Sequence, residues 1–245
     1  MKSFVAAGFL LATLAEVAQG HYIFQYLTAN GQKGAQYQNI RKNTNNNSPV
    51  TVLSDTNLRC NVGGASGSAT TVVSVAAGSS VSFTADQAVY HQGPVSFYMT
   101  KVSDAPSADG SSDWFKASLD PLSGCSRRRL RRANLFQIKE IGPTFSGGQA
   151  KWDMSTTYSV NIPSCIAPGD YLLRIEQLGI HNPGSPPQFY ISCAQVKVTG
   201  GGSTTLSPTT KIPGHVKSTD SGYTANIYNP DFKSYVVPGP KVATC

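Results

Sequence analysis

Long apolar runs are missing from the sequence. The most extended one, Phe4 to Leu14, is too short to cross a membrane, and no later stretch reaches the length that a spanning helix needs. Helical periodicity is missing too, since no window with apolar residues at helical spacing competes with the alternating segments. The sequence therefore excludes a membrane-spanning protein, predicts no membrane partner and disfavours a helical fold.

Charge is scarce as well, which limits the partners that the protein can have. Charged residues make up only 13% of the chain, and small polar residues are abundant, as in extracellular β proteins. Four of the seven formal net positive charges come from residues 117–137, where five arginines stand against Asp120. The rest of the chain is nearly balanced, so no nucleic-acid partner is predicted.

Paired carboxylates, which hydrolyse glycosidic bonds by acid–base catalysis, are not evident either. Four acidic residues lie in or beside predicted strands without an obvious shared cleft: Glu140, Asp153, Asp170 and Glu176. The sequence therefore argues against an ordinary hydrolase.

What the sequence does contain is a secretory start. Lys2 precedes the apolar run, and the small residues Ala18 and Gly20 stand where a signal peptidase reads the chain. Residues 1–20 are therefore predicted to be a signal peptide, and the mature protein to be secreted and extracellular. Cleavage after Gly20 would leave His21 as the new amino terminus.

A terminal histidine is a natural chelate. Its α-amino group and its ring Nδ1 can bind one metal ion together, and a terminal amine titrates at about 7.7–8.0, low enough to act as a ligand near neutral pH. Chance placement of His21 after a cleavage site remains the alternative at this point.

Short segments bounded by turn residues recur along the chain and are predicted to be strands. They cover residues 22–27, 50–53, 70–76, 80–84, 95–102, 158–162, 170–178 and 188–199. Ala77-Gly78-Ser79 is expected to join two of them as a hairpin. The pattern predicts an all-β fold, an immunoglobulin- or fibronectin-III-like β-sandwich with long loops, in a single domain over residues 21–245.

Two further features concern the end of the chain and its cysteines. Residues 200–245 open like a flexible linker but carry aromatic residues and end at Cys245, so this tail is expected to wrap back onto the domain. His215 in the tail matches no motif and is expected at the surface. Five cysteines leave one over in an oxidising compartment, and Cys125 lies in the arginine-rich segment, so two disulfides can form without it.

Several motifs, taken together and in order, resemble the lytic polysaccharide monooxygenases of auxiliary activity family 9, secreted fungal enzymes once classed as glycoside hydrolases. The resemblance covers residues 21–245 apart from the arginine-rich segment. It rests on His21, Tyr90-His91-Gln92-Gly93-Pro94, Trp114-Phe115-Lys116, Ala167-Pro168-Gly169-Asp170-Tyr171-Leu172-Leu173-Arg174, His181, and Gln188-Phe189-Tyr190-Ile191-Ser192-Cys193-Ala194-Gln195.

The resemblance implies one copper ion per chain. His21, through its amine and Nδ1, and His91 would bind the ion, with Tyr190 at the axial position. Three nitrogen donors suit the tetragonal preference of Cu(II). His181 and Gln188 would lie around the ion and act on bound oxygen, so that His181, Gln188 and Tyr190 form the implied catalytic set. The resemblance also implies a Cys60–Cys193 disulfide, which leaves Cys165 and Cys245 to each other.

The implied reaction is oxidative cleavage of β-1,4-glucan, with cellulose as substrate. It hydroxylates C1 or C4 of a glucose unit, using O2 or H2O2 and electrons from an external donor, a small reductant or a redox protein. Exposed aromatic rings would stack on the sugar faces, and Tyr22, Tyr223, Tyr228 and Tyr235 are the candidates. A monomer is expected.

Residues 117–137 do not fit the family pattern, in which Lys116 is followed directly by the equivalent of Ile138. The segment carries the odd cysteine and most of the net charge. We interpret it as translated intron, since 21 residues correspond to 63 nucleotides in frame. The alternative is a genuine surface loop whose arginines bind an acidic polymer or are cut by a protease.

Two non-catalytic functions compete with the enzyme: a secreted copper-binding protein, and a carbohydrate-binding β-sandwich without redox chemistry. The sequence leaves open C1 against C4 attack, activity on hemicelluloses, methylation of His21, and O2 against H2O2. It also leaves open glycosylation of Asn46, whose sequon is weakened by Pro49.

Overall fold

The computed structural model describes residues 21–117 and 140–245. These residues form strands joined by long loops, with one short 3₁₀ helix, η1 (Thr56–Leu58). The strands are β1 (Phe24–Ala29), β2 (Gln32–Lys33), β3 (Val73–Ala76), β4 (Ser80–Ala85), β5 (Val95–Val102), β6 (Trp114–Lys116), β7 (Thr144–Ser146), β8 (Gln149–Lys151), β9 (Thr157–Asn161), β10 (Gly169–Gly179), β11 (Gln188–Thr199) and β12 (Thr209–Thr210). Among the described residues, no helix is long and apolar enough to span a bilayer.

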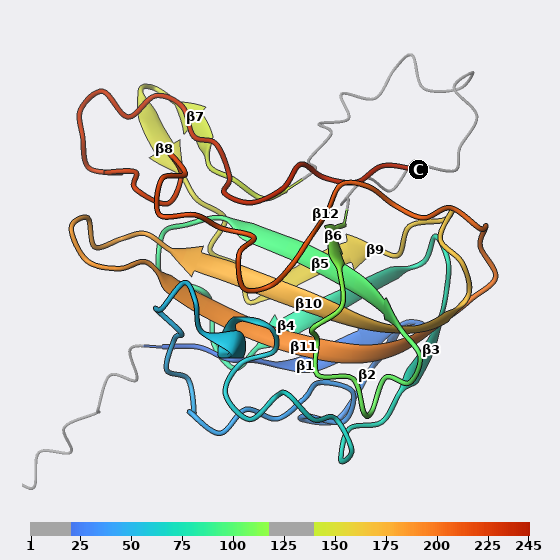
Figure 1. The fold of residues 1–245 in the computed structure, drawn as a ribbon. Coiled ribbons are helices and arrows are strands. Elements are labelled where there is room, and N and C mark those ends of the chain that lie inside the picture. Colours follow the sequence, from blue (N-terminus) through green and yellow to red (C-terminus); the bar gives the residue numbers. More distant parts are fainter. Residues whose placement is uncertain (1–20, 118–139) are drawn as a thin grey trace, which may run out of the picture.

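The strands build a β-sandwich, as predicted (Figure 1). One sheet has the order β2-β1-β4-β9, and the other has the order β12-β6-β5-β10-β11-β3. Apolar residues at alternate positions of both sheets meet between them, including Leu27, Phe83, Phe97 and Leu173. A small hairpin, β7–β8, lies apart from the two sheets.

The larger sheet is buried on both faces, because loops and the tail cover its outer side. Phe189 and Ile191 on β11 point to this outer face and pack there with Trp114 and Ile212. Figure 1 shows the red C-terminal segment running over this sheet toward the β7–β8 hairpin. The tail is also held covalently by the disulfide between Cys165 and Cys245. Two apolar layers on one sheet explain why β11 reads as apolar on both faces.

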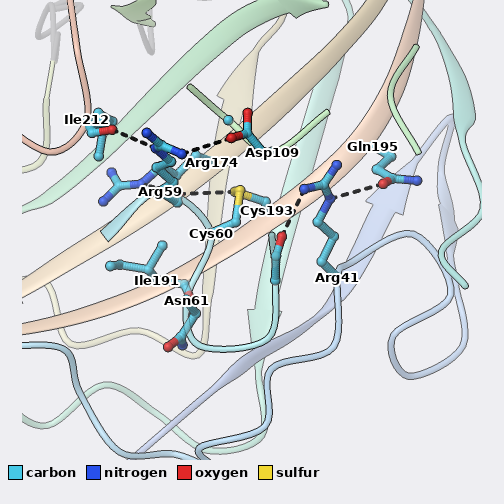
Figure 2. The surroundings of a disulfide bond; sticks show 12 residues. Arg41, Arg59, Cys60, Asn61, Asp109, Arg174, Ile191, Cys193, Gln195 and Ile212 are labelled. Atoms are coloured by element: carbon cyan, nitrogen blue, oxygen red, sulfur yellow. Dashed lines mark hydrogen bonds and ion pairs between the residues drawn. A yellow bond between two sulfur atoms is a disulfide. The ribbon is translucent and has the colours of Figure 1, made fainter. Parts of the chain in front are cut away.

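The Cys60–Cys193 disulfide, also as predicted, pins the loop after η1 to β11 (Figure 2). Asn61 donates a hydrogen bond to the carbonyl of Ile191 next to it, at 3.0 Å. Arg41 donates to three acceptors in the same region and is almost completely buried. By restricting the unfolded chain, the disulfide stabilises the fold by roughly a few kcal/mol.

Most predicted strands are present, but two predictions were wrong. Residues 50–53 form no strand; only Val50 makes a bridge, to Phe189. The predicted hairpin around Gly78 does not exist, because β3 pairs in parallel with β11 whereas β4 pairs with β1 and β9 in the other sheet. The turn therefore carries the chain from one layer of the sandwich to the other.

β6 ends at Lys116, just before residues 118–139, which the structure does not describe. After this gap the chain pairs with β5 again. Ala117 donates its backbone N–H to the carbonyl of Phe97. Two residues along β5, Val95 exchanges both backbone hydrogen bonds with Ile141. Ile141 thus takes the place that the second residue after Ala117 would hold in an unbroken strand. The predicted insert, 117–137, otherwise lies outside the described residues.

Contrary to the prediction of a surface position, His215 in the tail is buried. Its Nε2 lies 2.8 Å from Oε2 of Glu176, which also accepts a hydrogen bond from Arg174. Burial alone would raise the pKa of Glu176, but Arg174 and His215 outweigh it and lower that pKa to about 2. The contact with Glu176, which the sequence pattern of a polar tail conceals, gives this buried histidine a polar partner.

Candidate metal centre

The predicted ligands come from three separate parts of the fold. His21 immediately precedes β1, and His91 lies in the loop between β4 and β5. Tyr190 stands near the start of β11, so its position is fixed by the ladder with β10, where it pairs with Gln177. The site therefore joins the start of β1 in the smaller sheet to one end of the larger sheet.

These side chains converge. The ring centres of His21 and His91 are 5.8 Å apart, and that of Tyr190 lies 5.9 Å from His21 and 5.6 Å from His91. His21 and His91 are inclined by 58°, so their ring edges can face a shared point rather than stack.

The two histidine rings fit a single metal ion. A metal bound to an imidazole nitrogen lies about 2 Å from it, hence about 3 Å from the ring centre, so two rings sharing one ion have centres at most about 6 Å apart. The 5.8 Å separation meets that limit. Within residues 21–117 and 140–245, no group of three or more His, Cys, Asp or Glu side chains is arranged to hold a metal.

His181 and Gln188 also lie at the site, His181 in the loop that joins β10 to β11 and Gln188 at the first position of β11. The His181 ring stacks on His91 with centres 3.7 Å apart and planes 10° apart. Its Nδ1 is buried without a hydrogen-bond partner, whereas its Nε2 lies 3.1 Å from the amide of Asn182. Gln188 accepts a hydrogen bond from the hydroxyl of Tyr190 at 2.7 Å.

Burial sets the protonation states of these groups. Desolvation, helped by His181 and His21, lowers the pKa of His91 to about 4. Desolvation also lowers the pKa of His181 and raises that of Tyr190. At neutral pH the imidazole of His91 is thus neutral, as metal ligation requires, and the phenol of Tyr190 keeps its proton.

The predicted substrate-binding tyrosines separate into different environments. Tyr22 is only 1% exposed and stacks on Tyr190 with ring centres 4.3 Å apart, so the prediction that it contacts sugar was wrong. Tyr223 and Tyr235 are half-buried and pack in the outer apolar layer. Tyr228 is 60% exposed, and its hydroxyl donates to the carbonyl of His181 at 3.0 Å. Tyr228 alone of the four presents its ring to solvent beside the site.

A groove runs next to the site on the side of the β7–β8 hairpin. It encloses 550 Å³ and is lined by Gln92, the hairpin turn Gly147-Gly148, Trp152 and Tyr228, among others. Gln92 directly follows His91, so this groove reaches the neighbour of a predicted metal ligand.

Sequence reasoning missed the side chains that hold the histidine backbones. Asn47 and Gln87 both donate to the carbonyl of His21, and Gln177 donates to the carbonyl of His91. Gln177 carried a detectable signal, because it is a polar residue on the face of β10 that otherwise presents Leu173 and Ile175 to the core. Asn47 and Gln87 lie in loops, where polar residues are ordinary.

A β-sandwich with a cluster able to hold one metal ion is the class of protein that the fold and this site define. The model of Auxiliary Activity family 9 (formerly GH61) matches residues 21–235. Over its whole length the chain is 51% identical to AA9 family lytic polysaccharide monooxygenase E of Podospora anserina and covers 76% of it. It is 47% identical to AA9 family lytic polysaccharide monooxygenase A of Botryotinia fuckeliana, with 99% of this chain and 69% of that protein covered.

Solved structures also align with this chain. The crystal structure of HiLPMO9B aligns with a TM-score of 0.73 at 30% identity, covering 91% of this chain and 99% of the other. A cellulose-active polysaccharide monooxygenase from M. thermophila aligns with a TM-score of 0.72 at 28% identity, covering 91% and 100%. The chain therefore belongs to auxiliary activity family 9, the lytic polysaccharide monooxygenases. It is a copper-dependent oxidoreductase that cleaves polysaccharide oxidatively, which disfavours both non-catalytic alternatives.

Proposed function

We propose that the mature enzyme begins at His21 and holds one copper ion through the amine and Nδ1 of His21 and a ring nitrogen of His91. The observation that carries this proposal is the convergence of His21, His91 and Tyr190, with ring centres less than 6 Å apart. The family match, which starts at residue 21, supports cleavage after Gly20 and hence a secreted protein. We propose that it acts as a monomer.

When bound, copper supplies the one-electron redox chemistry that lets O2 or H2O2 oxidise a C–H bond. Tyr190 would lie beside the ion, and because burial raises its pKa the phenol would remain a neutral, weak donor. Gln188 accepts the proton of that phenol in a hydrogen bond, which holds the Tyr190 oxygen in place. The Nδ1 of His181, buried and unpartnered beside His91, is placed to hydrogen-bond an oxygen co-substrate and so to steer proton delivery to it.

The substrate that we propose is cellulose or a related β-1,4-glucan. With O2, hydroxylation at C1 or C4 takes two electrons from an external donor and two protons, and releases water; with H2O2 the same alcohol and water form without those electrons. The hydroxylated carbon then expels its glycosidic oxygen, and the chain breaks. The exposed ring of Tyr228 beside His181 suits stacking on a glucose face, and the M. thermophila relative is cellulose-active.

The test uses purified protein that begins at His21. Copper-loaded protein is incubated with cellulose and ascorbate, and mass spectrometry should find oxidised oligosaccharides. A matched variant that keeps Gly20 ahead of His21 should fold equally well, yet bind Cu(II) far more weakly and release no oxidised product, because its residue 21 nitrogen is a peptide amide. Equal copper binding and activity in both proteins would refute the proposed ligand set.

A further inference from the structure

Two side-chain amides clamp the backbone of the residue that is proposed to bear the amine. The Nδ2 of Asn47 and the Nε2 of Gln87 each donate to the carbonyl oxygen of His21, both at 2.6 Å. They approach from different loops, one before β3 and one after β4. A carbonyl oxygen accepts two hydrogen bonds at most in the usual geometry, so this one is saturated.

The next peptide group is fixed as well. Asp86 accepts the backbone N–H of Ile23 at 2.9 Å and that of Gln87 at 3.0 Å, which ties the loop carrying Gln87 to the start of β1. The backbone N–H of Asp86 in turn donates to the carbonyl of Ile23. The Gln87 half of the clamp is therefore anchored to β1.

A third amide spans the two proposed histidine ligands. Gln177 is completely buried on β10, and its Oε1 accepts the hydroxyl of Tyr22 while its Nε2 donates to the carbonyl of His91 at 3.0 Å. One planar amide thus joins the residue after His21 to the backbone of His91. The space for it depends on Gly93, since a Cβ there would lie 3.1 Å from the Nε2 of Gln177 and 1.8 Å from a strand carbonyl.

We propose that Asn47, Gln87 and Gln177 are positioning residues that set the spacing of the two histidines and thereby the coordination geometry of copper. The inference rests on the proposed ligand set. At a chain terminus only the following peptide plane restrains the amine, because no residue precedes it. Holding the carbonyl of His21 therefore fixes the Cα–C bond about which its amine and its Cβ turn, and Gln177 fixes the partner ligand relative to it. Outer partners of this kind typically change metal affinity by about 10–100-fold.

Gln177→Met tests the role of the Gln177 amide, which joins Tyr22 to the backbone of His91. Methionine has nearly the same length and volume but neither donates nor accepts strongly, so the core stays filled. Gln195→Met is the matched control. Gln195 is also completely buried, accepts a hydrogen bond from Arg41 and donates one to the carbonyl of Thr70, and neither partner belongs to the proposed copper site. Both variants should lower the melting temperature of the metal-free protein. Only Gln177→Met should alter the Cu(II) electron paramagnetic resonance spectrum and weaken Cu(II) binding, by about tenfold or more.

The clamp on His21 makes a sharper prediction, because either donor alone can still hold the carbonyl. Asn47→Ala and Gln87→Ala should each change the Cu(II) dissociation constant by less than about threefold, and the double variant by about tenfold, more than the two single effects multiplied. Asn39→Ala, which removes an amide bonded to Thr71, serves as control and should leave spectrum and affinity unchanged.

The outcomes separate the two proposals. If the parent protein takes up no copper, the proposed function fails. If the parent binds copper but Gln177→Met and the double variant keep its spectrum and affinity while remaining folded, the positioning role fails. A spectrum changed equally by Gln195→Met would also overturn it, since loss of packing alone would then suffice.

Discussion

Removing residues 118–139 should leave a stable, copper-binding enzyme. Ala117 and Ile141 already lie on one line beside β5, opposite Phe97 and Val95, which are two residues apart. Joining Ala117 directly to Glu140 puts a single residue between the two ladder positions, as an unbroken strand requires. The deletion therefore keeps every backbone hydrogen bond on both sides of the junction.

The expected gain in stability follows from closing a shorter loop. Closing a loop of 22 residues costs about 2–3 kcal/mol in chain entropy, and the direct junction avoids nearly all of it. In a protein of this size, that corresponds to a rise in melting temperature of about 5–10 °C.

Thermal unfolding of the metal-free proteins measures the effect, and Cu(II) titration checks the site. A control in which residues 118–139 are replaced by a Gly/Ser segment of equal length should keep the parent stability, because it changes composition without changing length. A deletion variant that melts below the parent, or no longer binds copper, would show that the line along β5 is not a continuous strand.

The remaining predictions concern other parts of the molecule. If residues 117–137 are translated intron, peptide mapping of the naturally secreted protein with a protease that spares lysine should find Lys116 joined to Ile138; a peptide from within the segment would refute it. Gly93→Ala should cost about 3 kcal/mol of stability or more by denaturant unfolding, because the added carbon meets a strand carbonyl at 1.8 Å. Tyr228→Ala should weaken binding to cellulose about fivefold in a pull-down assay while Cu(II) affinity stays the same, since about 1 kcal/mol is typical of a stacked ring. Unfolding measured against pH should show a loss of about 3 kcal/mol as pH falls from 4.5 toward 2, because the folded-state pKa of Glu176 is about 2 and its ordinary value is 4.5; Glu176→Gln should flatten this dependence.

Much of the sandwich could be predicted because its strands carry local sequence signals. The segments 95–102 and 188–199 have β-branched and aromatic residues between turn signals, and both were found with the bounds of β5 and β11. Pairing was harder, since Gly78 reads as a hairpin turn whether its flanking strands pair with each other or belong to different sheets. The short strands β7, β8 and β12 carry too few residues for a periodic pattern.

The site shows the same division between local and long-range information. His21 and His91 were identified from motifs, and their convergence is a property of the sandwich that no local pattern encodes. Tyr22 was misjudged because a tyrosine beside a ligand looks the same in sequence whether its ring faces solvent or, as here, packs on Tyr190. His215 was misjudged because its partner, Glu176, lies 39 positions away.

These errors have one physical source, which also explains how the site is held. A loop residue at a two-sheet junction can be placed only by partners from distant segments, and here those partners are amides directed at peptide carbonyls. An amide is neutral, so it can be buried next to a metal site without adding charge, and it can donate and accept at once, as Gln177 does. A charged side chain in the same place would shift the protonation of His91, and an apolar one would leave a buried carbonyl unpaired. The residues that best explain the geometry of the proposed copper site are thus the ones least visible in its sequence motifs.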